Sequence, residues 1–476
     1  MGHREDTVWD RSCLSRMARA SGSVAVATAC AGLTPVLAQV PVQRGAIARQ
    51  VDTYLKPYLD AAAFSGAVLL ARGGKILLSK GYGMANYELN IPNTPQTKFH
   101  IASLSKTFTA AAILLLQDRG LLGVQDPIAR FIPDYPRGND ITLHHLLTHT
   151  SGIPDINDLA GYDSLSRFAQ TPASLIAVFR DRPLLFEPGA RYSYSNSNYN
   201  LLAYVIEKVS GKTYGEFLHE NIFGPAGMTS TSHDGDPATL VVNRATGYVP
   251  SGLFDLANAP FLDWSAKTGN GSIYSTVEDL YRWDRALYTH ALLKQTSIDL
   301  MFTPQVEGVG YGWLVRRQFG RRVIRMSGRS PGFSAEIQRY PDDDVCIIVL
   351  SNNYAATATT IAGDLAAMVF GEKYQALTVV QPVNVPTSLL DGYAGSYQGG
   401  PDFLIPGVTL SLEIRGGRLT MVWSSGAVVP LVPQSDSTFL DRKFWGMVRF
   451  VRDRRGDVGE LHYQIGGREY VARRLG

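Results

Sequence analysis

The stretch FHIASLSKTF at residues 99–108 places a serine, Ser103, three residues before a lysine, Lys106. The apolar run that follows predicts a helix from Ser103 to about Asp118, with Gly120 as its C-terminal cap. Residues three apart on a helix lie on the same face, so the hydroxyl and the amine can approach each other. The spacing therefore places a weak nucleophile beside a base that becomes effective when desolvation lowers its pKa.

The Ser103–Lys106 spacing is a weak signal by itself. A chain of this size contains about one S-x-x-K by chance, and an N-cap serine followed by a solvated lysine explains it equally well. A second pattern, YSN at residues 194–196, adds a tyrosine and an amide. Tyr194 can relay protons if Lys106 lowers its pKa, and Asn196 can hold the lysine or bind a substrate carbonyl. Taken alone, this triplet is equally compatible with an ordinary turn.

Five motifs in a fixed order make the assignment far more specific. They are FHIASLSK at 99–106, LLTHTSG at 146–152, FEPG at 186–189 leading to YSN at 194–196, GSIYST at 271–276, and Gly328 followed by PGFS at 331–334. In their residues and their order these motifs resemble those of the serine β-lactamase and penicillin-binding protein superfamily, and most closely those of its class C branch. The resemblance extends over about residues 48–370.

This resemblance implies a role for each motif residue. Ser103 is the acylated residue, Lys106 and Tyr194 transfer its proton, and Asn196 positions the reacting groups. The backbone N–H groups of Ser103 and Arg329 form the oxyanion hole. No metal or organic cofactor is implied.

The third motif departs from the family pattern. Members usually carry Lys or His at its first position, whereas this chain has Met326, followed by Ser327 and Gly328 in the substrate-binding stretch. Met326 has no charge and no donor, so the group that usually helps to bind a substrate carboxylate is missing. Strand alternation puts Arg325 on the opposite face, while Arg329 is expected to compensate in part. The hypothesis that follows is a preference for neutral acyl groups.

Four other patterns resemble functional motifs and are interpreted as structural. The letters KTG at 267–269 precede a helical segment and predict a loop. GRSPG at 328–332 fits G-x-S-x-G but leads into an extended run, which predicts a turn. The spacing of His145 and His149 suits a metal, yet no glutamate follows His145, and the family resemblance makes His149 structural. GKT at 211–213 lacks the first glycine of a phosphate-binding loop.

The pattern of strands and helices predicts the architecture. Two apolar runs around Gly73-Gly74 indicate a hairpin, helical segments fill about 125–300, and strand-like runs return at 311–315, 322–326, 333–340 and 345–350. This predicts an α+β domain over 48–375, an antiparallel sheet flanked by helices, with its two terminal parts joined in one sheet. A linker at 376–388 leads to short alternating runs at 389–476, which predict a small all-β barrel or sandwich. The family resemblance implies the first of these, a small lipocalin-like β-barrel of the kind that some members append.

The N-terminus is typical of a secretory signal. A positive region around Met17 precedes an uncharged apolar segment at 22–37, and small residues allow cleavage near Ala38. The segment is shorter than the roughly 20 residues that a spanning helix needs. Residues 1–38 are thus predicted to be removed from an exported, periplasmic or secreted protein. Residues 1–16 are unusual in front of a signal, which leaves a start of translation at Met17 open. Acylation at Cys30 and a disordered N-terminal tail are the alternatives to a cleaved signal.

Composition narrows the function further. The 45 basic and 42 acidic residues give a net charge of +3 without basic clusters, which points away from nucleic acid and anionic membranes. Beyond the predicted signal only Cys346 remains, in a run that reads as a buried strand, so no internal disulfide is expected.

The combined reading is a serine hydrolase that forms an acyl-enzyme with a small ester, amide or D-amino-acid peptide. A β-lactamase or a D,D-peptidase or D-aminopeptidase is the alternative within enzymes, and a non-catalytic binding or scaffold protein is the alternative of another class. The oligomeric state is left open.

Overall fold

A computed structural model describes residues 45–355, 357–374, 382–424, 428–465 and 468–475. The predicted signal segment lies outside these residues, as do residues 376–381 of the predicted linker. Among the described residues no helix has the length and apolar character needed to cross a membrane.

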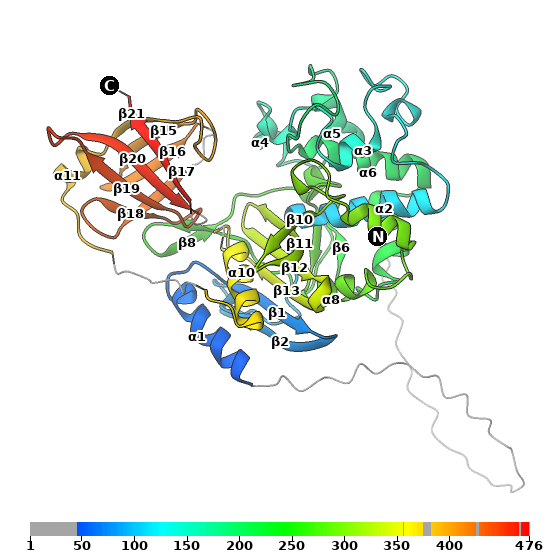
Figure 1. Cartoon of the computed structure of the whole chain (residues 1–476), viewed down its shortest axis with the longest axis horizontal. Helices are drawn as coiled ribbons and strands as arrows, with labels where there is room; N and C mark the ends of the chain where they lie inside the picture. The colour runs from blue at the N-terminus through cyan, green and yellow to red at the C-terminus, as the bar shows by residue number, and fades with distance from the viewer. Residues whose placement is uncertain (1–44, 356, 375–381, 425–427, 466–467, 476) are drawn as a thin grey trace, which may run out of the picture. The chain divides into compact units, whose positions relative to one another are not determined.

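A six-stranded antiparallel sheet forms the centre of the first domain (Figure 1). Its order is β10-β11-β12-β13-β1-β2, so the N-terminal hairpin pairs with the last strand of the domain. The strands are β10 (Leu314–Gln318), β11 (Arg321–Ser330), β12 (Phe333–Tyr340), β13 (Val345–Ser351), β1 (Gly66–Arg72) and β2 (Lys75–Tyr82). The predicted α+β class and the joining of the two ends in one sheet are confirmed.

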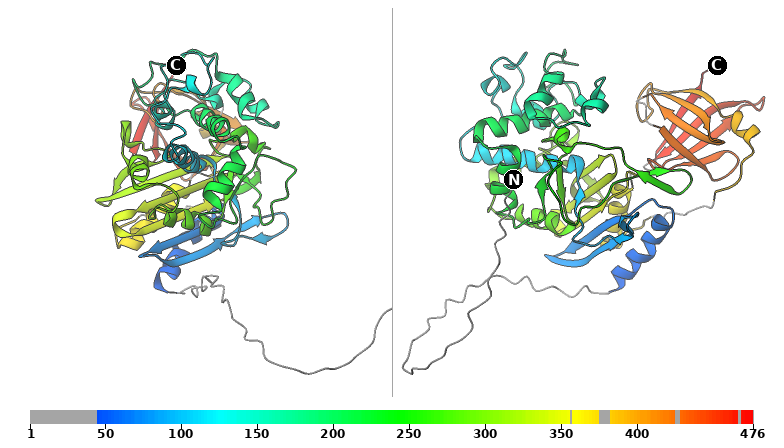
Figure 2. Two further views of the ribbon diagram at one scale, coloured as in Figure 1. Left: turned by 90° about the vertical axis from the view of Figure 1, so that its right-hand side faces the viewer. Right: turned by 180° about the vertical axis from the view of Figure 1, so that it is seen from behind.

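Helices cover both faces of the sheet. Since the side chains of successive strand residues point to opposite faces, they pack against these helices in two separate clusters. Val68 and Leu70 pack in one cluster with α1 (Ala46–Asp60) and α10 (Ala358–Phe370). Leu69 packs in the larger cluster on the other face, with α2 (Lys106–Asp118) and α8 (Val277–Ala286). Figure 2 shows α2, in cyan, from two further sides, beside the green helix α6 (Asn196–Ser210).

Short elements connect these layers. They are β3 (Met84–Asn86), β4 (Ile91–Pro92), β5 (Phe99–His100), the 3₁₀ turn η1 (Ala102–Ser105), α3 (Leu143–Leu147), α4 (Tyr162–Leu165), α5 (Pro172–Phe179), α7 (Tyr214–Leu218), β6 (Ser232–His233), β7 (Tyr248–Ser251), β8 (Asp255–Asn258), the 3₁₀ turn η5 (Trp264–Lys267), β9 (Ile273–Ser275) and α9 (Gln295–Phe302). The predicted helix at 103–118 is thus a 3₁₀ turn that continues as α2, and Gly120 adopts the left-handed conformation expected of a cap.

The C-terminal segment is a closed eight-stranded barrel, in which β14 pairs with β21 (Figure 1). Its strands are β14 (Gly395–Gly399), β15 (Thr409–Arg415), β16 (Arg418–Trp423), β17 (Val428–Pro433), β18 (Thr438–Asp441), β19 (Met447–Arg452), β20 (Val458–Ile465) and β21 (Arg468–Arg474). Helix α11 (Thr387–Asp391) precedes them and spans residue 388, where the linker was predicted to end. A core of its own fills this segment.

Candidate active site

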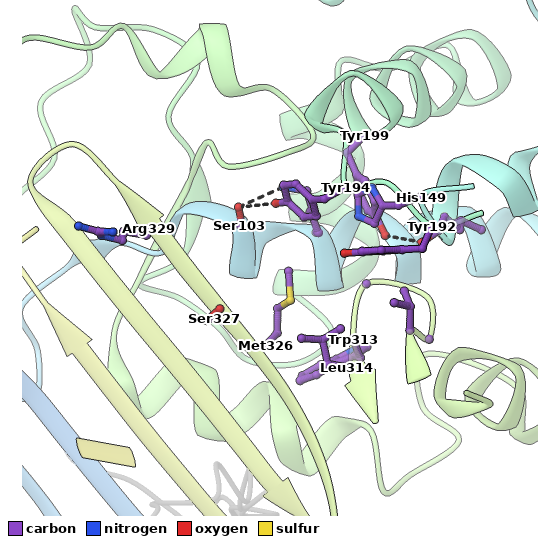
Figure 3. Close-up of a pocket in the computed structure, with 15 residues that line it drawn as sticks. Ser103, His149, Tyr192, Tyr194, Tyr199, Trp313, Leu314, Met326, Ser327 and Arg329 are labelled. Atoms are coloured by element: carbon purple, nitrogen blue, oxygen red, sulfur yellow. Dashed lines mark hydrogen bonds between the residues drawn. The ribbon is translucent and has the colours of Figure 1, made fainter. Parts of the chain in front are cut away.

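Ser103 lines a cavity of about 250 Å³ (Figure 3). It belongs to η1, directly before α2, and the preceding Ala102 has φ +47°. A non-glycine residue in this region is strained by about 1–2 kcal/mol. Such strain is typical of positions whose geometry serves a reacting group.

Lys106 is completely buried and is directed at Ser103. Its Nζ donates to Asn196 Oδ1 at 2.9 Å and to the carbonyl oxygen of Asn270 at 2.8 Å, and it lies 3.1 Å from Ser103 Oγ. The first two partners can only accept, so they take two N–H groups of the amine. In the neutral amine the lone pair is then left for the Ser103 hydroxyl.

Burial lowers the pKa of Lys106 well below its usual value, which favours this neutral form. The nearby Asp155 carboxylate acts in the opposite direction and raises the pKa of Lys106, whereas Lys267 lowers it. Desolvation has the largest influence of the three. Desolvation therefore favours the neutral amine, which is the form that a general base needs.

Tyr194 completes the contacts of Ser103, with its Oη 2.8 Å from Ser103 Oγ. Its ring is 37% exposed to the cavity, but desolvation of the hydroxyl raises the pKa of Tyr194. The expectation that the pKa of Tyr194 is lowered is wrong, because desolvation has the largest influence and raises it. Tyr194 is therefore a neutral phenol that can donate a proton or a hydrogen bond.

Asn196 is fixed by Asp155, which the sequence did not single out. The Asp155 carboxylate accepts the backbone N–H of Asn196 at 3.1 Å and its side-chain Nδ2 at 3.0 Å. This leaves Oδ1 of the amide facing Lys106. Asn196 is the first residue of α6, so its contacts with Asp155 fix both the start of this helix and the amide oxygen that accepts from Lys106.

His149 is one wall of the same site rather than a metal ligand. It lies beyond the end of α3 at φ +58°, and its Nδ1 accepts the backbone N–H of Ser195 at 3.1 Å. Its ring packs 4.5 Å from that of Tyr194, and burial lowers the pKa of His149 to about 3. His145 instead belongs to the N-terminal capping box of α3.

Strand β11 lies against η1 because Gly328 has no side chain. A Cβ atom at this position would lie 1.9 Å from the carbonyl oxygen of Ile101. Next to it, Met326 and Ser327 line the cavity, and Met326 is buried. Arg325 forms an ion pair with the buried Glu336, as strand alternation predicted.

The Arg329 side chain does not replace the missing cation of the third motif. Its guanidinium donates to the carbonyl oxygens of Tyr354 and Lys443, both at 3.0 Å, and lies over the Tyr354 ring. Those contacts hold the charge at the end of β11, apart from Met326 (Figure 3). The expected compensation is therefore wrong, because Nε and Nη2 of the guanidinium donate to protein carbonyl groups away from Met326.

The remaining cavity wall is mostly aromatic and aliphatic, and sequence reasoning missed it. It consists of Leu147, Tyr192, Tyr199, Val309, Trp313 and Leu314. Lys106 Nζ lies 5.0 Å and 5.5 Å from the ring centres of Tyr194 and Tyr199. Apart from Lys106 and Arg329, no charged side chain lines this cavity in the described part of the chain.

The other three patterns lie in turns and helix ends. Lys267 ends η5 instead of lying on a strand, Pro331-Gly332 forms the β11–β12 turn, and Gly211 caps α6 before the capping box of Thr213.

Comparison with known proteins agrees with this fold. The family description "Beta-lactamase" matches residues 51–372. Penicillin-binding protein 4* of Bacillus subtilis (strain 168) is 30% identical over 453 residues, which cover 89% of this chain and 98% of that protein. A penicillin-binding protein from Bacillus halodurans has 30% identity and a TM-score of 0.59, over 67% of this chain and 98% of that one.

A D-amino acid amidase from Ochrobactrum anthropi SV3 has the same fold, with 22% identity and a TM-score of 0.61 over 69% of this chain and 99% of the amidase. The fold and the site define a serine hydrolase of the class C β-lactamase and penicillin-binding protein type. The chain belongs to the beta-lactamase family.

Proposed function

We propose that the protein hydrolyses small esters or amides with neutral acyl groups through an acyl-enzyme on Ser103. The observation that supports this most is the contact set of Ser103 Oγ, which lies 3.1 Å from a buried amine and 2.8 Å from a phenol. A serine with a desolvated base and a proton donor has the parts that nucleophilic catalysis needs.

In the proposed reaction, Lys106 Nζ takes the hydroxyl proton while Ser103 Oγ bonds to the substrate carbonyl carbon. The backbone N–H groups of Ser103 and Arg329 stabilise the resulting oxyanion. The bond from the carbonyl carbon to the leaving group then breaks, while Tyr194 donates its proton to that group and is reprotonated by the Lys106 ammonium. Attack of water on the acyl-enzyme then releases the acid and restores Ser103.

The cavity supports the preference for neutral acyl groups. Met326 stands where a cation would meet a carboxylate, and Tyr192, Trp313 and Leu314 line the same cavity. A charged group would lose hydration there without a partner. The second candidate is hydrolysis of a penicillin or a D-amino-acid amide, which the names of the relatives favour.

The test compares kcat/KM for a short-chain p-nitrophenyl ester, a D-alanyl peptide and nitrocefin. We expect the ester to be the best substrate. Faster hydrolysis of nitrocefin or of the peptide would contradict the proposed preference and support the second candidate.

Replacing Met326 by lysine is expected to raise the ratio of kcat/KM for a carboxylate-bearing penicillin to that for a neutral ester. A charge-assisted hydrogen bond contributes about 1.5–3 kcal/mol, so the ratio should increase by about tenfold or more. Met326→Leu is the matched control and should leave the ratio unchanged. Equal ratios for the lysine and leucine variants would mean that Met326 does not set this preference.

A further inference from the structure

A second buried lysine, Lys267, lies behind Lys106. It is 8% exposed, its Nζ donates to Asn157 Oδ1 at 3.2 Å, and it lies 4.9 Å from the ring centre of Tyr162. We find no carboxylate at ion-pair distance from it among the described residues. The nearest carboxylates that influence it are Asp155 and Asp163.

This arrangement is costly for the fold. Moving an ammonium group out of water without an ion-pair partner is unfavourable, and such groups tend to cluster at functional sites. Burial lowers the pKa of Lys267 to about 8, while Asp155 and Asp163 counteract that shift. At neutral pH the side chain is therefore mostly charged.

The backbone of Lys267 supports one of the two acceptors that hold Lys106. Its carbonyl oxygen accepts the N–H groups of Asn270 at 3.0 Å and Gly271 at 2.8 Å. The carbonyl oxygen of Asn270 in turn accepts from Lys106 Nζ. The turn that ends η5 thus fixes the direction of one N–H of the catalytic amine.

The side chain of Lys267 leads to the other acceptor. Asn157, which it binds, donates its backbone N–H to Asp155 Oδ1 at 3.1 Å. Asp155 holds Asn196, whose Oδ1 accepts from Lys106. Both amide-type partners of Lys106 are therefore connected to Lys267.

We propose that Lys267 is a positioning residue for Lys106: it anchors the Asn157–Asp155–Asn196 contacts and places a second positive charge behind the catalytic amine. This inference rests on the proposed role of Lys106 as the base for Ser103. Lys267, the first residue of the KTG sequence that was predicted to be a loop, thereby receives a functional role.

The charged groups that face Lys106 determine in which direction its pKa should shift when Lys267 is replaced. Its charged neighbours are Asp155 and Lys267, while His149, Tyr194 and Tyr199 stay uncharged near neutral pH because burial lowers the pKa of the histidine and raises those of the tyrosines. Loss of the Lys267 charge leaves Asp155 unopposed. The pKa of Lys106 should then rise, so that a higher pH is needed to free its lone pair.

The test follows the pH dependence of the second-order rate of fluorophosphonate labelling, which requires no natural substrate. In Lys267→Gln we expect the acidic limb to move up by about one pH unit, so that labelling on that limb falls by up to about tenfold. Above about pH 8, where Lys267 itself loses its charge, the variant and the wild type should converge. Lys267→Arg, which keeps the charge, should retain the wild-type limb.

Lys212→Gln is the matched control, because Lys212 is an exposed lysine that pairs with Glu220 far from Ser103 in the sequence. A purely structural role would instead lower the Tm of Lys267→Gln and slow labelling equally at every pH, and that result would overturn the inference. An unchanged pH profile would overturn it as well. Failure of the wild type to be labelled at any pH would contradict the proposed function itself.

Discussion

Replacement of Lys106 by glutamine is expected to slow acylation of Ser103 by about 10²–10⁴-fold, the usual contribution of a positioned general base. Glutamine can still donate to Asn196 Oδ1 and the Asn270 carbonyl, but it has no lone pair that accepts the serine proton. The loss should therefore appear in the acylation rate. Stopped-flow or labelling kinetics with a fluorophosphonate measure it directly.

Lys106→Arg separates the two roles that the lysine can have. Arginine keeps a positive charge and remains protonated at all accessible pH values, so it cannot act as a base. We expect this variant to be as slow as Lys106→Gln. Near wild-type acylation by the arginine variant would show that Lys106 acts as a cation and not as a proton acceptor.

Replacement of Gly328 by alanine is expected to lower both stability and activity. Since the new Cβ would lie 1.9 Å from the Ile101 carbonyl oxygen, β11 has to move away from the turn that carries Ser103. Overpacking of this kind costs about 1–3 kcal/mol. A shift of about 1 Å at reacting groups reduces rates by about 10²-fold.

Gly459→Ala provides the control for this prediction. Gly459 also lies in a strand, β20. A Cβ atom at this position would have no atom within 4 Å apart from those of Gly459 and the two residues next to it in the chain. Thermal unfolding and ester hydrolysis of the two variants should differ clearly. If Gly328→Ala kept the wild-type Tm and activity, the close contact of β11 with η1 would not be needed for the site.

Much of the fold could be predicted from local patterns. The Gly73-Gly74 hairpin and the strands at 333–340 and 345–350 appear almost residue for residue, because long apolar runs and glycine turns are strong local signals. Strand β10 was expected at 311–315 but lies at Leu314–Gln318. Gly312 with φ +76° interrupts the run, and Trp313 is buried at the cavity instead.

A small barrel or sandwich was predicted from half of the strands of the barrel. The runs at 409–414, 419–423, 447–451 and 460–465 were recognised, whereas β14, β17, β18 and β21 were not. These four are short or contain glycine, proline or many charges, all of which weaken the strand pattern. Pairing with neighbours, which local patterns do not contain, closes the barrel.

The candidate site divides in the same way. Ser103, Lys106, Tyr194 and Asn196 were found from their motifs, and the structure brings them together. Asp155, Asn270 and Lys267 were missed because their roles depend on contacts between distant segments, and each looks like an ordinary loop residue. The pKa of Tyr194 was misjudged because burial cannot be read from spacing.

The central claim is that Ser103 Oγ is the nucleophile. The most direct test is to treat wild type and Ser103→Ala with a fluorophosphonate and to locate the adduct by peptide mass spectrometry. The account predicts one stoichiometric adduct on the peptide that contains Ser103, and none in the alanine variant. An unlabelled wild type, or equal labelling of both proteins, would contradict it and favour a binding or scaffold role.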